Sequence, residues 1–173
     1  MKLAHSILAG AALAVTMATA APAADLLVRN DPVYDAPLFN FEGLYLGGSA
    51  GGALSSTTPG LVVGGVAGAN FAITDGIIVG GEIQADTYWN GGLSGYDVLA
   101  LGRVGGFVAE NTMIYGDLGG GVHNNNAVYA VGGGVEIALT GPLSARGDLQ
   151  AIGNFGSFPD TAKATAGLLW HLN

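Results

Sequence analysis

The chain has 173 residues, of which 31 are glycine, 50% are hydrophobic and only 10% are charged. An average soluble domain carries about 25% charged residues and about 7% glycine, so this chain either buries almost all of its surface or lies in lipid. Its formal net charge of −8 argues against nucleic acid as a partner. Cysteine is absent, which excludes disulfides, thiolate metal sites and cysteine nucleophiles.

Residues 1–23 have the layout of a secretory signal peptide. Lys2 supplies the positive start, an apolar stretch runs from Ile7 to Met17, and A-x-A patterns predict cleavage after Ala20 or Ala23. An N-terminal transmembrane anchor is the alternative, but the apolar core is short for spanning a bilayer. Residues 24–40 contain prolines and lack a clear periodicity, which predicts an extended periplasmic leader.

Clusters of turn-forming residues divide the remainder, residues 41–173, into segments. Glycine runs cost a helix about 1 kcal/mol per residue relative to alanine, so strands are predicted. The segments exceed the usual strand of about 5–6 residues and suit tilted membrane strands of about 9–11 residues. We expect strands at 41–53, 61–73, 77–89, 96–108, 113–123, 127–139, 143–154 and 161–172.

Charged residues occupy alternate positions in these segments. In residues 77–89, Glu82 and Asp86 alternate with Ile77, Val79 and Ile83. From the second strand onward, one face carries no charge, as expected of the lipid-facing side of a membrane barrel. A soluble sandwich would instead present a wet face rich in Lys and Glu. The sequence therefore predicts an all-β fold, an eight-stranded antiparallel up-and-down transmembrane β-barrel over residues 41–173.

The other face is predicted to line the barrel interior. An eight-stranded interior is just wide enough for side chains to fill, and arginine can bridge two carboxylates, which favours a filled interior. Glycines on this face, such as Gly68 and Gly132, leave open the alternative of water-filled gaps, and a wet acidic interior would favour cations. The charged residues assigned to the interior are Glu82, Asp86, Asp97, Arg103, Asp117, Glu136, Arg146, Asp148 and Lys163.

Aromatic residues near the strand ends are predicted to form the two interfacial girdles of a bilayer barrel. One girdle is expected to contain Tyr88, Trp89, Tyr96 and Tyr129. The other is expected to contain Phe71, Phe107, Tyr115 and Trp170.

Candidate catalytic and metal-binding groups are few. His123 and His171 fall on different strands, which argues against a histidine metal site, and no cofactor is expected. A Ser–His–acid hydrolase set could be assembled only from His123, Ser94 and either Asp86 or Asp97. A barrel hydrolase would need this set on its lipid-facing rim. His123 and these acids are predicted to face the interior instead, so no enzyme activity is predicted.

The predicted outer loops carry one charge, Asp160, so they offer no basic patch for a polyanion. Phe155 and Phe158 form an apolar pair in the last of these loops. They could dock a partner, dip into the membrane interface or pack over the barrel mouth.

The predicted barrel opens with Phe41-Glu42-Gly43-Leu44-Tyr45-Leu46-Gly47-Gly48. With the signal peptide, the AADL-type mature start and the Pro-Val-Tyr leader, this motif resembles the opacity-like small outer-membrane β-barrel family, especially its alphaproteobacterial porin-like branch. The resemblance implies both termini on the periplasmic side, no catalytic residues, and contact with outer-membrane lipid and with the insertion machinery. Such proteins usually end on an aromatic residue, so here either Trp170 serves that role in a shifted register or assembly is weak.

The expected function is that of a structural, non-catalytic outer-membrane protein that contributes to cell-envelope integrity. One alternative is a narrow, weakly cation-selective, porin-like channel. Another is a soluble periplasmic carrier like a lipocalin, whose interior should be apolar and whose exterior should be charged, the reverse of the predicted phases. The last alternative is a barrel enzyme that acts on lipids.

Overall fold

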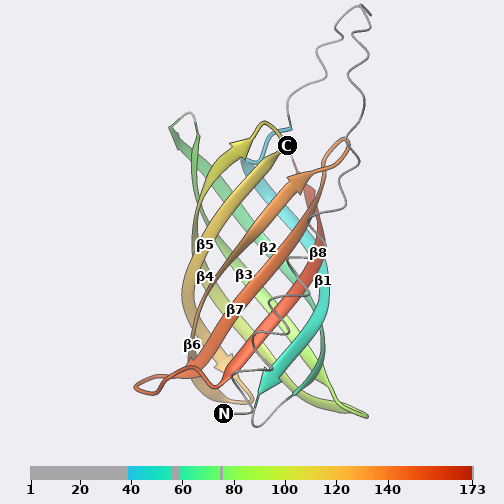
Figure 1. Cartoon of the computed structure of the whole chain (residues 1–173), viewed down its shortest axis with the longest axis vertical. Coiled ribbons are helices and arrows are strands. Elements are labelled where there is room, and N and C mark those ends of the chain that lie inside the picture. The colour runs from blue at the N-terminus through green and yellow to red at the C-terminus, as the bar shows by residue number, and fades with distance from the viewer. Residues whose placement is uncertain (1–38, 56–58, 75, 173) are drawn as a thin grey trace, which may run out of the picture. The chain divides into compact units, whose positions relative to one another are not determined.

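A computed structural model describes residues 39–55, 59–74 and 76–172 of the chain. Each strand in this part pairs antiparallel with its neighbour in sequence, and the first pairs with the last, so the sheet closes into a barrel (Figure 1). The predicted fold is therefore confirmed. The strands are β1 (Gly43–Ser55), β2 (Gly60–Thr74), β3 (Ile77–Trp89), β4 (Leu93–Ala109), β5 (Thr112–His123), β6 (Asn126–Ala138), β7 (Leu143–Asn154) and β8 (Thr161–His171).

Part of the sequence-based prediction falls beyond these residues. The signal peptide predicted over 1–23, and the leader predicted over 24–40 apart from its last two residues, lie outside the described residues. Within the described ranges, no helix is long and apolar enough to cross a membrane.

The start of β1 differs from the prediction for a local reason. The strand was expected to begin at Phe41 but begins at Gly43, which has a φ of 94°. A residue with a side chain rarely adopts this backbone conformation, so the glycine allows the chain to bend there. The bend leaves Phe41 free to turn into the barrel, where its side chain is buried.

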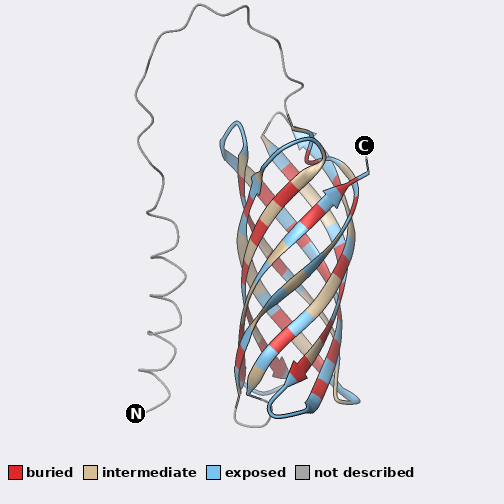
Figure 2. Ribbon diagram, turned by 90° about the vertical axis from the view of Figure 1, so that its right-hand side faces the viewer, coloured by how far each residue is buried: buried red, intermediate tan, exposed pale blue. Residues whose placement is uncertain are grey.

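Burial alternates along each strand, as the banding in Figure 2 shows. In β4, Arg103 is buried whereas its neighbour Val104 is 54% exposed. Exposed side chains on the outer wall are mostly Leu, Ile, Val and aromatic residues, including Leu44, Ile83, Leu118, Leu149 and Leu168. An apolar outer wall around a polar interior is the arrangement of a transmembrane barrel.

The interior is filled in layers between the two ends of the barrel. We call the end at which β1 begins and β8 ends the terminal end, and the opposite one the distal end. At the terminal end, Phe41, Ile78, Met113 and Tyr115 form an apolar cluster. Charged side chains fill the middle. Toward the distal end, apolar side chains return in two clusters, one of which is made by Leu99, Leu101, Val128, Ala130 and Ile152.

Candidate functional site

The centre of the interior is an ionic network built around two arginines, which we call the arginine network. Arg103 projects from β4 and Arg146 from β7, and both reach Glu82 of β3. Arg146 Nη1 lies 2.8 Å from Glu82 Oε2, and Arg103 Nη1 lies 3.4 Å from the same oxygen. One buried carboxylate therefore joins two strands that are not neighbours in the sheet.

Each arginine also holds a second carboxylate. Arg103 Nη2 lies 3.2 Å from Glu136 Oε2, and Arg146 Nε lies 2.8 Å from Asp148 Oδ2. The side chains of all five residues are at most 3% exposed. In such a site, removing one partner leaves a buried charge without compensation, which costs much more than the loss of a surface ion pair.

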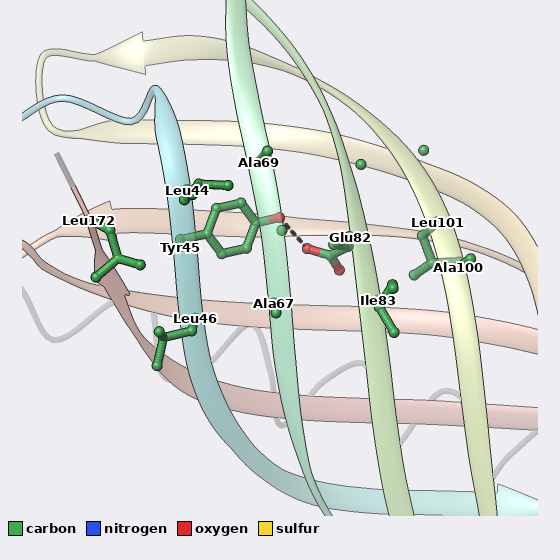
Figure 3. A pocket seen from close by; sticks show the side chains of 13 residues that line it. Leu44, Tyr45, Leu46, Ala67, Ala69, Glu82, Ile83, Ala100, Leu101 and Leu172 are labelled. Carbon is green, nitrogen blue, oxygen red and sulfur yellow. Dashed lines mark hydrogen bonds between the residues drawn. The ribbon is translucent and has the colours of Figure 1, made fainter.

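Two tyrosines complete the arginine network. The Tyr45 hydroxyl donates to Glu82 Oε2 at 2.6 Å and accepts from Arg103 Nη1 at 3.0 Å; Figure 3 shows its contact with Glu82. The Tyr115 hydroxyl donates to Asp148. The Tyr115 ring also lies against the Arg103 guanidinium, whose Cζ is 3.9 Å from the ring centroid, a cation–π contact.

Glu136 connects this network to the terminal end. Its Oε1 accepts a hydrogen bond from Ser144 Oγ at 2.8 Å and lies 2.9 Å from His171 Nε2. The His171 ring stands edge-on to Phe39, with ring centroids 4.9 Å apart. The ionic and apolar layers are thus in direct contact.

A second ionic group, the lysine cluster, lies nearer the distal end. Lys163 Nζ is 2.5 Å from Asp86 Oδ2 and 3.6 Å from Asp97 Oδ2. Gln84 Oε1 accepts from the same ammonium at 3.5 Å. The Tyr88 hydroxyl donates to Asp97 Oδ2 at 2.5 Å. One lysine therefore forms ion pairs with two carboxylates in this cluster.

An aromatic plug closes the terminal end. The Phe39 and Phe41 rings meet edge to face with centroids 4.7 Å apart, and Phe41 lies 5.4 Å from the Phe107 ring. Asn70 Nδ2 fixes the segment by donating to the Phe41 carbonyl at 2.9 Å. The residues just before β1 therefore fill the mouth of the barrel.

Interior glycines make room for large side chains. A Cβ at Gly68 would overlap the Tyr45 ring, and one at Gly134 would overlap the Tyr115 ring. At Gly132, the Gln150 Cγ would lie 2.7 Å from an added Cβ. At these positions the water-filled gaps considered from the sequence are occupied by protein side chains.

All nine charged residues that the sequence assigns to the interior lie there, and each is at most 5% exposed. The ion pairs described above join eight of them. Within the described ranges, the side chain of the ninth, Asp117, has one hydrogen bond, accepted from Gln150 Nε2 at 3.5 Å.

Two aromatic assignments were wrong. Tyr88 and Tyr115 were expected in the girdles, but both are buried inside the barrel and donate to interior carboxylates. The reason is strand phase: Tyr88 lies an even number of residues from Asp86, and Tyr115 from Asp117, so each shares its neighbour's inward face. Phe107 shares the inward phase of Arg103 and lies against Phe41 at the terminal end. The other girdle residues, which are Phe71, Trp89, Tyr96, Tyr129 and Trp170, are exposed or half-buried.

The possible hydrolase residues lie toward the distal end, where Asp97 is the register partner of His123. Ser94 and His123 line a pocket of about 310 Å³ at the distal end, together with Asp160. Asp86 and Asp97, the acids of that set, both lie close to the Lys163 ammonium in the lysine cluster. The carboxylates suggested for a catalytic set therefore hold a buried ammonium.

The outer wall carries an apolar groove of about 710 Å³. Small residues such as Ala67, Gly81 and Gly102 line it. Larger side chains such as Leu44 and Leu172 line it as well (Figure 3). Its apolar lining is the surface chemistry expected on the outer wall of a membrane barrel.

Sequence reasoning did not assign several further polar residues to the interior network. They share the inward phase of the charged residues, so parity along each strand was the signal that could have found them. These residues are Tyr45, Asn70, Gln84, Ser144, Gln150 and His171.

No protein-family model matches this chain, and a sequence comparison with the curated proteins finds no match. Solved structures do match. Ail, the attachment invasion locus protein of Yersinia pestis, is 11% identical with a TM-score of 0.54, over 74% of this chain and 94% of that one. The N-terminal β-barrel domain of Pseudomonas aeruginosa OprF is 13% identical with a TM-score of 0.53, over 75% and 98%. At these identities the likeness shows a shared fold, the small eight-stranded membrane barrel.

Proposed function

We propose that this protein is an outer-membrane β-barrel with a structural, non-catalytic role in the cell envelope, and that it belongs with the opacity-like barrels that its opening motif resembles. The observation that carries the proposal is the filled interior. The arginine network occupies the middle of the barrel, and the aromatic plug closes its terminal end. A barrel filled in this way stabilises itself in lipid without a passage for solutes.

Cell fractionation combined with a deletion strain tests this role. The protein is expected in the outer-membrane fraction, cleaved after Ala20 or Ala23, with a gel mobility that shifts on boiling. Deletion is expected to increase sensitivity to detergent and leakage of periplasmic proteins, and the wild-type chain should restore both. Recovery in the soluble periplasm with no heat-dependent shift would overturn the membrane assignment.

A narrow cation channel is the second candidate, favoured by the acidic excess of the interior. Six carboxylates face three basic side chains there, and a net negative lining favours cations where water enters. This candidate predicts a small potassium-selective conductance in planar bilayers, whereas the filled barrel predicts none.

The carrier alternative has less support. Ion pairs fill the middle of the described interior, and the large exposed side chains of the outer wall are mostly apolar. A carrier for an apolar ligand requires the opposite distribution.

A further inference from the structure

We propose that Asp117 and Gln150 form an interior binding site for one small monovalent cation, such as sodium or potassium. The proposal rests on charge balance, on unpartnered buried oxygens and on the position of these residues in the barrel. It does not depend on whether the barrel conducts.

The interior holds more negative than positive charge. Six carboxylates and three basic side chains are buried there, which leaves three formal negative charges. Isolated charges are very costly in an apolar environment, so buried charges are paired or bind ions. The excess therefore has to be compensated by something other than the basic side chains of the interior.

Asp117 is the one interior carboxylate that forms no ion pair with a basic side chain among the described residues. It is 5% exposed, and its Oδ2 has no hydrogen-bond partner among the described residues. Gln150 is 4% exposed, and its Oε1 is likewise unpartnered in that part of the chain. Gln150 Nε2 lies 3.5 Å from Asp117 Oδ1, so the two head groups are neighbours. Each has one buried oxygen without a hydrogen-bond partner among the described residues.

The basic side chains of the interior form ion pairs with other carboxylates. Arg103 is the register partner of Asp117 across β4 and β5, but its guanidinium binds Glu82 and Glu136. Arg146 likewise binds Glu82 and Asp148. Lys163 holds the two carboxylates of the lysine cluster.

The strand register places the site beside Gly132, and apolar side chains lie on its distal side. Asp117 and Gln150 both pair with Gly132, one from each neighbouring strand. On the distal side, Leu101 and Ala130 belong to the buried apolar cluster of β4, β6 and β7. Water on that side is therefore restricted, which raises the cost of leaving the carboxylate uncompensated.

The donor set fits a monovalent cation. A carboxylate oxygen and an amide oxygen are hard ligands that suit alkali and alkaline-earth ions. Among the described residues, no group of three or more His, Cys, Asp or Glu side chains could hold a metal ion. One carboxylate balances one unit of charge, and the remaining coordination positions of the ion are available to water.

Urea unfolding in nonionic detergent tests the site. The full-length mature protein is compared in sodium, potassium and N-methylglucamine chloride at equal ionic strength, because the organic cation is too large for the site. Above the dissociation constant, a tenfold rise in small cation should raise the folded-to-unfolded ratio about tenfold. Equal stability in all three salts would overturn the proposal.

Two variants locate the effect. Asp117→Asn keeps the size but removes the charge, and it is expected to abolish the preference for sodium or potassium over N-methylglucamine. Asp160→Asn, which removes an exposed carboxylate in the loop before β8, is the matched control and should keep it. If Asp117→Asn does not fold, Gln150→Leu should weaken the cation dependence about tenfold or more in apparent affinity.

A proton bound at Asp117 is the competing outcome. It predicts that stability does not depend on the cation but falls as the pH rises from 5 to 8, and that Asp117→Asn removes this pH dependence. That result would overturn the cation site, as would a Gln150→Leu variant with unchanged cation dependence.

Discussion

The interior and the outer wall of this barrel are made by alternate residues of the same strands, yet a charge has opposite consequences on the two surfaces. Arg103 is buried among carboxylates, and removing it would leave Glu82 and Glu136 with less compensation. Val104, the next residue, faces outward and is exposed. Strand phase therefore decides whether a charge stabilises or destabilises the fold at each position.

The interior side of this comparison predicts the largest effect. Arg146→Met should lower the free energy of unfolding by about 3–5 kcal/mol, because Glu82 and Asp148 then lose a buried partner. Urea unfolding in detergent micelles measures the change. In the double variant Arg146→Met/Asp148→Leu, part of the stability should return, since one unpaired carboxylate is gone. A single variant as stable as the wild type would show that the arginine network contributes little.

The outer wall predicts the next effect. Val104→Arg should cost about 2–4 kcal/mol in a bilayer, because it places a charge on the lipid-facing side of β4. Leu139→Arg is the matched control, since this exposed leucine follows the end of β6. Unfolding in phospholipid vesicles measures both variants. Equal costs at the two positions would mean that the assigned phase of β4 is wrong.

The two tyrosine environments can be separated by removing single hydroxyls. Tyr88→Phe should cost about 1–3 kcal/mol, because Asp97 loses a buried donor at 2.5 Å. Tyr96→Phe, whose hydroxyl contacts Asn125 at an exposed site at 2.8 Å, should cost less than about 1 kcal/mol. The reverse order in urea unfolding would place Tyr88 in the outer girdle after all.

The smallest effect is expected for a substitution in the loop between β7 and β8, at the distal end. Phe158 is 93% exposed, so Phe158→Ser should change the free energy of unfolding in micelles by no more than about 0.5 kcal/mol. A loss above about 2 kcal/mol would show that this loop packs over the barrel mouth.

The strand layout could be predicted well from the sequence because turn residues and alternation are both local signals. The predicted bounds of β3 and β7, 77–89 and 143–154, agree with the structure. The start of β4 was predicted at residue 96, but the strand begins at Leu93. In a glycine-rich turn the sequence pattern does not show at which residue strand pairing begins. The start of β1 was missed because Phe41 packs in the interior rather than in the sheet.

The inward location of the charges also followed from alternation, whereas their pairing did not. Glu82 meets Arg146 across 64 positions of sequence, and that contact depends on the tilt and register of strands that are not neighbours. The same limit applies to Asp117. Its strand partner is Arg103, so local reasoning favours an ion pair between them, and only the three-dimensional structure shows that the guanidinium is committed elsewhere.

The filled interior is most directly tested by recording from the folded wild-type protein in planar bilayers. In symmetric potassium chloride, the arginine network and the aromatic plug predict no stepwise conductance above that of the empty bilayer. The mature protein used should show the heat-dependent gel shift of a folded barrel, so that a silent recording reflects the folded state. A reproducible stepwise conductance, with a reversal potential in a salt gradient that favours potassium over chloride, would contradict the filled barrel and establish the cation channel.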